Sequence, residues 1–253
     1  MSTVERIDHS NLHLLGKGFY NEFGIDTALG YEETEVGGWF PKIGIGLLKK
    51  EPGPYSFSKN YQIQPAAFKV KKAVNQLIIS CRSKKVNGYA YLLRKEIELT
   101  ENGFTINYFL ENRGEKDIIT DEYVHNFTAI QQDPIGPNYQ LQFPFLLKPK
   151  LFGETVNPTH KVNIGAQGFS FNGHPSDPFF FSNLSGNESV AAAWELRHLK
   201  HKIAIKETGN FQTKKVNLWG WKQVISPELF FNINIKSGAA VEWSRAYEIY
   251  RLY

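Results

Sequence analysis

Residues 95–114 read KEIELTENGFTINYFLENRG, two runs rich in β-branched and aromatic residues on either side of the turn Glu101-Asn102-Gly103. Such runs favour extended backbone, because branched and aromatic side chains pack well on a pleated surface. Gly103 can take the positive φ that a tight turn requires. The stretch therefore predicts an antiparallel β-hairpin.

Runs of the same kind recur along the chain, each closed by Gly, Asn, Asp or Pro. Nine runs fit this description: residues 77–81, 89–99, 104–111, 118–130, 139–145, 202–207, 221–225, 229–236 and 241–250. Glycine-containing turns at residues 112–115 and 236–238 predict two further hairpins. Because no regularly spaced helices separate the runs, the sequence predicts an all-β fold, a large antiparallel β-sandwich.

One segment could form a helix instead. Residues 188–202 contain three consecutive alanines, which favour helix. The residues that follow alternate at period two, with Trp194, Leu196 and His198 on one face and Glu195 and Arg197 on the other. We therefore predict a strand here.

Length and composition indicate one globular domain spanning residues 1–253. The chain has no linker-like segment and no internal repeat, and large β-sandwiches reach this size as one domain. Its 29 basic and 25 acidic residues are spread along the chain and give a net charge of +4. This charge distribution lacks the concentrated positive field that attracts nucleic acid, so we expect no nucleic-acid partner. The sequence leaves the oligomeric state open.

The apolar runs are too short to cross a lipid bilayer, so we expect no membrane association. The polar N-terminus lacks the apolar segment of an export signal, which predicts a cytoplasmic protein. Cys81 is the only cysteine, so no intrachain disulfide can form. It lies in an apolar run, where we expect a buried, unreactive thiol.

Residues 120–128 place titratable side chains in a run that otherwise has the pattern of a strand. On a strand, His125 shares a face with Asp121, Tyr123 and Phe127. Burying polar groups there costs free energy unless they are paired. His125 is therefore a candidate catalytic residue; the alternative is a core histidine whose partner is a backbone carbonyl.

A second segment, residues 226–235, carries Glu228 where we expect a strand to begin. Pro227 stiffens the chain before it and Phe230 lies on the same face, so a cleft could hold this carboxylate with a shifted pKa. The alternative is a solvated glutamate. An imidazole acid and a carboxylate base together can open and close a cyclic hemiacetal.

Other residues are candidates for binding. Residues 37–48 are rich in glycine but lack the Gly-Lys-Ser/Thr ending of a phosphate-binding loop, so we expect a bend or close strand packing that leaves Lys42 available to a ligand. Trp221 could support the C–H face of a sugar, or belong to the core. Two pairs, His174 with Asp177 and His198 with His201, each offer half of a metal site. Because no further ligands can be identified, we expect no metal and no other cofactor.

Residues 95–114 and the His125 segment together resemble the middle of galactose mutarotase-like proteins, the aldose 1-epimerase superfamily. There, two strands, a turn and a strand containing histidine occur in this order. The closing run from Ser226 through Gly238 to Tyr247 is similar to the end of the family, where a catalytic glutamate precedes a turn and a final strand. The resemblance covers roughly the last two-thirds of the chain and implies a supersandwich fold.

The resemblance implies that His125 protonates the ring oxygen of a sugar and that Glu228 takes the proton of the anomeric hydroxyl. It places Asp177 near the position of an aspartate that binds sugar hydroxyls. We also expect Asn126 and Arg245, which lie in the two matching segments, to contact the sugar. The family reads His-x-Tyr-Phe-Asn where this chain has His125-Asn126-Phe127, and the family's earlier histidine and arginine have no match.

The sequence thus predicts an aldose 1-epimerase that interconverts the anomers of an unidentified small-molecule sugar without a cofactor. One alternative is a noncatalytic carbohydrate-binding or sensing domain. Another is a polysaccharide-processing enzyme, because related sandwich folds also occur as accessory domains of larger lyases.

Overall fold

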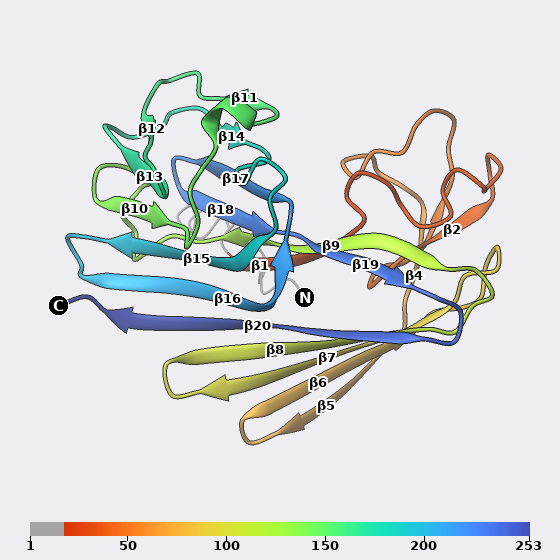
Figure 1. Ribbon diagram of the computed structural model, residues 1–253. Coiled ribbons are helices and arrows are strands. Elements are labelled where there is room, and N and C mark those ends of the chain that lie inside the picture. The colour runs from red at the N-terminus through yellow and green to blue at the C-terminus, as the bar shows by residue number, and fades with distance from the viewer. Residues whose placement is uncertain (1–17) are drawn as a thin grey trace. The chain divides into compact units, whose positions relative to one another are not determined.

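The computed structural model describes residues 18–253, whose regular secondary structure consists almost entirely of β-strands (Figure 1). This part of the chain forms twenty strands, β1 to β20, and one short 3-10 helix, η2 (Pro149–Leu151). Neighbouring strands pair antiparallel in the hairpins and ladders described below. The predicted all-β, antiparallel fold class is confirmed. Within residues 18–253, no helix has the length and apolar character needed to span a membrane.

The strands form two compact units, each made from separate stretches of the chain. Unit 1 contains residues 18–21, 123–230 and 246–253, and unit 2 contains residues 22–122 and 231–245. Three strands contribute residues to both units: β1 (Gly18–Phe23), β9 (Ile118–Phe127) and β20 (Ala240–Arg251). The expectation of a single domain stays a prediction.

Unit 1 contains two sheets whose facing aromatic side chains form its core. The first has the order β12-β13-β10-β15-β16 and the second the order β11-β14-β17-β18. Phe169 and Phe171 of β13 contact Phe181 and Phe179 of β14, with ring centroids 5.2 and 5.8 Å apart. The strands run as follows: β10 Tyr139–Gln142, β11 Thr155–Val156, β12 Val162–Ile164, β13 Gly168–Phe171, β14 Phe179–Phe181, β15 Val190–His198, β16 Ile203–Thr213, β17 Val216–Trp221 and β18 Val224–Leu229.

Unit 2 contains the strand order β5-β6-β7-β8 and a separate sheet, β2-β3-β4. Its remaining strand, β19, pairs with residues 118–122 of β9. Ala28, Tyr31, Phe40 and Leu48 form a buried cluster in this unit. The strands run as follows: β2 Trp39–Lys42, β3 Gly46–Lys49, β4 Ile63–Pro65, β5 Phe68–Ala73, β6 Gln76–Arg82, β7 Tyr91–Thr100, β8 Gly103–Asn112 and β19 Phe231–Ile235.

Several local predictions are confirmed. Strands β7 and β8 form the hairpin expected from residues 95–114, with Thr100 opposite Gly103. Residues 190–198 are strand β15 and not a helix. Cys81 is buried, and burial raises the pKa of its thiol. The glycine-rich segment forms the β2–β3 hairpin, with Gly44 at φ 77° in the bend.

Three local predictions are wrong. The turns at residues 112–115 and 236–238 do not close hairpins, because β8 pairs with β7 whereas β9 and β19 pair with each other. Residues 221–225 are not one strand, since the chain turns between Trp221 and Val224. Glu228 therefore lies inside β18 and not at the start of a new strand. A turn sequence specifies local backbone, but the partner of each strand depends on residues far away in the chain.

Candidate active site

Two strands of unit 1 bring His125 and Glu228 together. Thr128, just after β9, exchanges both backbone hydrogen bonds with Ile225 of β18, at 2.9 Å each. Continuing this antiparallel register by three residues places His125 opposite Glu228. The Nδ1 atom of His125 lies 3.0 Å from Oε1 of Glu228. The structure thus brings together the two residues predicted to be catalytic.

Tyr123 completes a chain of three side chains. Its hydroxyl lies 2.6 Å from Nε2 of His125, and its ring stacks on Phe230 with centroids 4.5 Å apart. With Glu228 ionised, Nδ1–H of His125 donates to the carboxylate, so Nε2 of a neutral imidazole accepts from the Tyr123 hydroxyl. Ser226 also donates to Oε1 of Glu228, at 3.3 Å. This network fixes the orientation of the imidazole ring.

The pair is recessed but not sealed from solvent. The side chain of His125 is 21% exposed and that of Glu228 is 6% exposed, whereas Tyr123 is fully buried. The imidazole of His125 is therefore partly accessible to solvent. The short His125–Glu228 distance leaves no space for a pyranose ring between the two side chains.

Aromatic side chains line the approach to His125. The ring of Phe127 stacks on His125 with centroids 5.0 Å apart, and Trp219 and Tyr20 contact Phe127 at 5.3 and 5.5 Å. Phe127, Trp219 and Tyr20 are all partly exposed. Partly exposed aromatic rings offer the apolar surface on which the C–H face of a sugar packs. Trp219 was missed by the sequence reasoning, although it shares a face of β17 with the predicted Trp221.

Trp221 and Asp177 lie around one loop of unit 1. The indole N–H of Trp221 donates to the backbone oxygen of Ser176 at 2.9 Å. The neighbouring Asp177 is exposed and accepts a hydrogen bond from the Ser176 hydroxyl at 2.7 Å. Trp221 is therefore hydrogen-bonded to the loop that carries Asp177. Contact of either residue with a sugar stays a prediction.

Asn126 follows His125 in the chain and is fully buried. Its two amide hydrogens are directed at Oε2 of Glu207 and the backbone oxygen of Pro227, at 2.8 and 2.7 Å. Its oxygen accepts from Tyr247 at 2.9 Å. Because both donors are used and solvent does not reach the amide, this geometry corrects the expectation of direct sugar contact. Asn126, which follows His125 in the chain, is instead bonded to Pro227, which precedes Glu228.

Lys42 and Arg245 belong to unit 2, where both are buried with a carboxylate partner. Lys42 donates to the backbone oxygens of Phe23 and Gly24 and to the hydroxyl of Tyr55, and its ammonium lies 2.5 Å from Glu22. Only 4% of Lys42 is exposed, so the expectation that it is available to a ligand is corrected.

Arg245 is fully buried and donates to Glu122 at 2.7 Å. Trp243 donates to the same carboxylate oxygen at 3.0 Å. Arg245 therefore has a structural role inside unit 2, where the Glu122 carboxylate compensates its charge. Because Arg245 is buried and paired with a carboxylate, as Lys42 is, the expectation that it contacts a sugar is corrected.

One group of metal-ligating side chains occurs among residues 18–253: Asp133, His198 and His201. His198 and His201 were predicted to offer half of a metal site. Asp133 is the further candidate ligand that could not be identified from sequence. For the other half-site, the structure shows that Nδ1 of His174 bonds to the backbone oxygen of Ile135 at 2.9 Å.

Fold and site together define an all-β protein with a hydrogen-bonded histidine–glutamate pair beside partly exposed aromatic rings. No protein-family model matches the chain, and no curated protein matches its sequence. The fold, in contrast, is found in several solved structures. A galactose mutarotase-like protein from Clostridium acetobutylicum matches with a TM-score of 0.56 at 12% identity, over 98% of this chain and 84% of the other.

A galactose mutarotase-like protein from Lactobacillus casei matches with a TM-score of 0.52 at 13% identity, over 92% of this chain and 85% of the other. The aldose epimerase homologue from C. elegans matches with a TM-score of 0.51 at 11% identity, over 92% of this chain and 88% of the other. The chain therefore has the galactose mutarotase-like fold, and the expected supersandwich is confirmed.

Proposed function

We propose that this protein is an aldose 1-epimerase-like enzyme that opens and recloses the ring of a small sugar at the His125–Glu228 pair. The observation that carries the proposal is the 3.0 Å contact between the two side chains, of which the His125 imidazole is partly exposed to solvent. The fold, which is that of galactose mutarotase-like proteins, and the aromatic rings beside the pair support it.

The short distance between the acid and the base suits this reaction. The ring oxygen and the anomeric hydroxyl of an aldose are bonded to the same carbon, so the groups that serve them have to reach two neighbouring atoms. Acid and base on opposite walls of a wide cleft could not do so. The sugar would therefore lie across the exposed edge of the pair, with its apolar face on Phe127 and Trp219.

The proton transfers balance without a cofactor. Glu228 accepts the proton of the anomeric hydroxyl, and the bond between the anomeric carbon and the ring oxygen breaks as the aldehyde forms. His125 first takes up a proton from solvent at Nε2 and then gives this proton to the ring oxygen, which replaces the Tyr123 hydroxyl as the partner of this nitrogen. Rotation of the aldehyde and reversal of both transfers close the ring as the other anomer and restore both side chains.

The experiment that tests the proposal measures turnover and sugar affinity together. Glu228→Gln keeps the shape of the side chain but removes its basicity, so we expect anomer exchange to fall about a hundredfold or more while sugar affinity changes little. Glu188→Gln, at an exposed surface glutamate, is the matched control and should behave as wild type. Equal turnover in the wild type and the Glu228→Gln variant would contradict the assignment.

A noncatalytic sugar-binding domain is the second candidate function. The observation that favours it is the Tyr123 hydroxyl on Nε2 of His125, since this contact occupies the nitrogen that the ring oxygen needs. Calorimetric binding of sugars by a wild-type protein that does not accelerate anomer exchange would select this function.

A further inference from the structure

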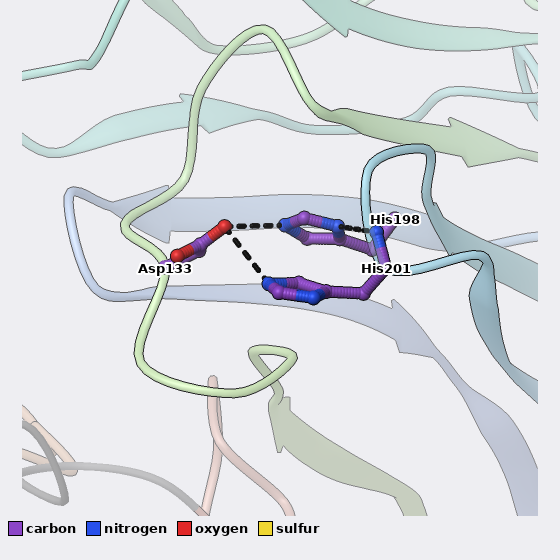
Figure 2. A group of neighbouring side chains, drawn as sticks. All are labelled: Asp133, His198 and His201. Atoms are coloured by element: carbon purple, nitrogen blue, oxygen red, sulfur yellow. Dashed lines mark hydrogen bonds and ion pairs between the residues drawn. The ribbon is translucent and has the colours of Figure 1, made fainter.

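A second cluster of chemically active side chains lies in unit 1, outside the catalytic pair. Asp133 lies in the connection between β9 and β10, His198 is the last residue of β15, and His201 lies in the turn to β16. Figure 2 shows the two imidazole rings directed at the same carboxylate oxygen. We propose that Asp133, His198 and His201 form a binding site for a divalent first-row transition ion of the Zn²⁺ type.

The distances fit such an ion. Oδ2 of Asp133 lies 3.2 Å from Nε2 of His198 and 3.1 Å from Nε2 of His201, and the three donor atoms lie within 4.8 Å of one another. Ligands about 2.0–2.2 Å from a tetrahedral zinc ion are about 3.3 Å apart. Two of the three separations therefore already match, and a small movement of the His201 side chain, which is 31% exposed, adjusts the third.

A second observation points to a ligand. His198 is fully buried, and the contact of its Nε2 atom with Oδ2 of Asp133, at 3.2 Å, does not have the geometry of a good hydrogen bond. A buried polar atom without a well-formed hydrogen bond costs free energy, and such atoms are rare in folded proteins. The side chain is thus held at the cluster with its outer nitrogen directed at Asp133 but poorly hydrogen-bonded.

The surroundings hold two of the ligands in place. The Tyr139 hydroxyl lies 2.9 Å from the backbone oxygen of Asp133 and 3.0 Å from that of Ile130, and its single proton is shared between these two acceptors. The ring of Tyr139 also packs edge-on against His198, with centroids 4.5 Å apart. Fixing the ligands before a metal arrives reduces the entropy cost of binding, so this framework favours a defined site.

The chemistry of the donors sets the class of ion. Two imidazoles and one carboxylate suit Zn²⁺, Co²⁺ and Ni²⁺ better than Mg²⁺ or Ca²⁺, which prefer oxygen ligands. Three protein ligands leave a coordination position for water or another small ligand.

Binding requires one local rearrangement. The backbone N–H of His201 donates to Nδ1 of His198 at 3.1 Å, which places the proton of the neutral imidazole on Nε2. A metal on Nε2 moves this proton to Nδ1, so the His201 amide has to turn away. We therefore expect the amide resonance of His201 to shift when the ion binds.

The test is calorimetric titration of the full chain with Zn²⁺, together with the visible absorption spectrum of Co²⁺, in the absence of sugar. The wild type should bind one ion at this cluster. His201→Gln and Asp133→Asn should each weaken binding about tenfold or more. His160→Gln changes an exposed histidine elsewhere in unit 1 and should leave binding unchanged.

Circular dichroism establishes that each variant is folded. Absence of binding to the wild type would overturn the proposal, and so would equal affinity in His201→Gln, which would place the ion elsewhere in the chain. Unchanged affinity in Asp133→Asn would overturn the three-residue site. Because no sugar is present, the result does not depend on the proposed epimerase activity.

Discussion

Tyr123 shows at the scale of single residues what sequence reasoning can and cannot find. Strand periodicity predicted that Tyr123, His125 and Phe127 share a face, and the hydrogen bond and ring contact among them agree with this. The partner of His125 was harder to find, because Glu228 lies 103 residues further along the chain. Acid–base chemistry suggested that these two residues could act together, and the resemblance to a known family supported it, but the sequence alone could not show that they meet.

Replacing Tyr123 tests how strongly the hydroxyl holds the imidazole. Tyr123→Phe keeps the ring on Phe230 but removes a buried hydrogen bond, so we expect the free energy of unfolding to fall by about 1 kcal/mol. Urea denaturation measures this difference. Tyr253→Phe, at a fully exposed tyrosine, is the control and should change nothing measurable. An unchanged midpoint for Tyr123→Phe would show that the bond contributes no stability.

Lys42 shows a different failure of sequence reasoning. A lysine among glycines looks available to a ligand, because sequence does not reveal that Glu22 and two backbone oxygens surround its ammonium. Lys42→Met leaves the Glu22 carboxylate without its partner, and we expect the free energy of unfolding to fall by about 3 kcal/mol.

The matched control is Lys59→Met, because Lys59 forms a more exposed ion pair with Glu51. We expect a loss of less than about 1 kcal/mol there. Both variants are measured by chemical denaturation. Equal stability of the two variants would contradict the structural role assigned to Lys42.

At the scale of elements, local pattern predicted most strands but not their partners. The β7–β8 hairpin and strand β15 were predicted because alternation and a glycine turn are local signals. Glu228 was placed at the start of a strand, after a proline that stiffens the chain. In the structure Pro227 is accommodated inside β18, which is the edge strand of its sheet and whose other side forms an isolated bridge between Ile225 and Thr128.

Strand β17 offers a test of packing between elements. A Cβ atom on Gly220 would lie 2.3 Å from Cζ of the buried Phe179 ring on β14. Gly220→Ala forces one of these strands to move, so we expect the free energy of unfolding to fall by about 1–3 kcal/mol. At the exposed Gly165 the nearest atom would be 3.4 Å away, and Gly165→Ala should be tolerated. Similar denaturation midpoints for the two variants would contradict the tight β14–β17 contact.

At the scale of the whole molecule, each compact unit is assembled from separate stretches of the chain. Sequence reasoning predicted a single domain because no linker interrupts the chain, but contacts between distant segments cannot be seen in composition. Such long-range pairing slows folding, because the loops have to close before the contacts form.

A fragment tests whether the separate stretches of unit 2 depend on each other. Residues 22–122 alone lack β19, which pairs with residues 118–122, and lack Arg245, which neutralises the fully buried Glu122. We therefore expect this fragment to show no cooperative thermal transition by circular dichroism. A sigmoidal transition in the fragment would contradict the dependence on residues 231–245.

The central claim is that His125 and Glu228 act on the anomeric carbon of a sugar. Magnetisation-exchange NMR on a panel of hexoses, pentoses and sugar phosphates measures the α–β interconversion rate directly, with and without the wild-type protein. We expect at least one sugar to exchange faster in proportion to protein concentration. Exchange that stays at the spontaneous rate for every sugar of the panel would contradict the claim.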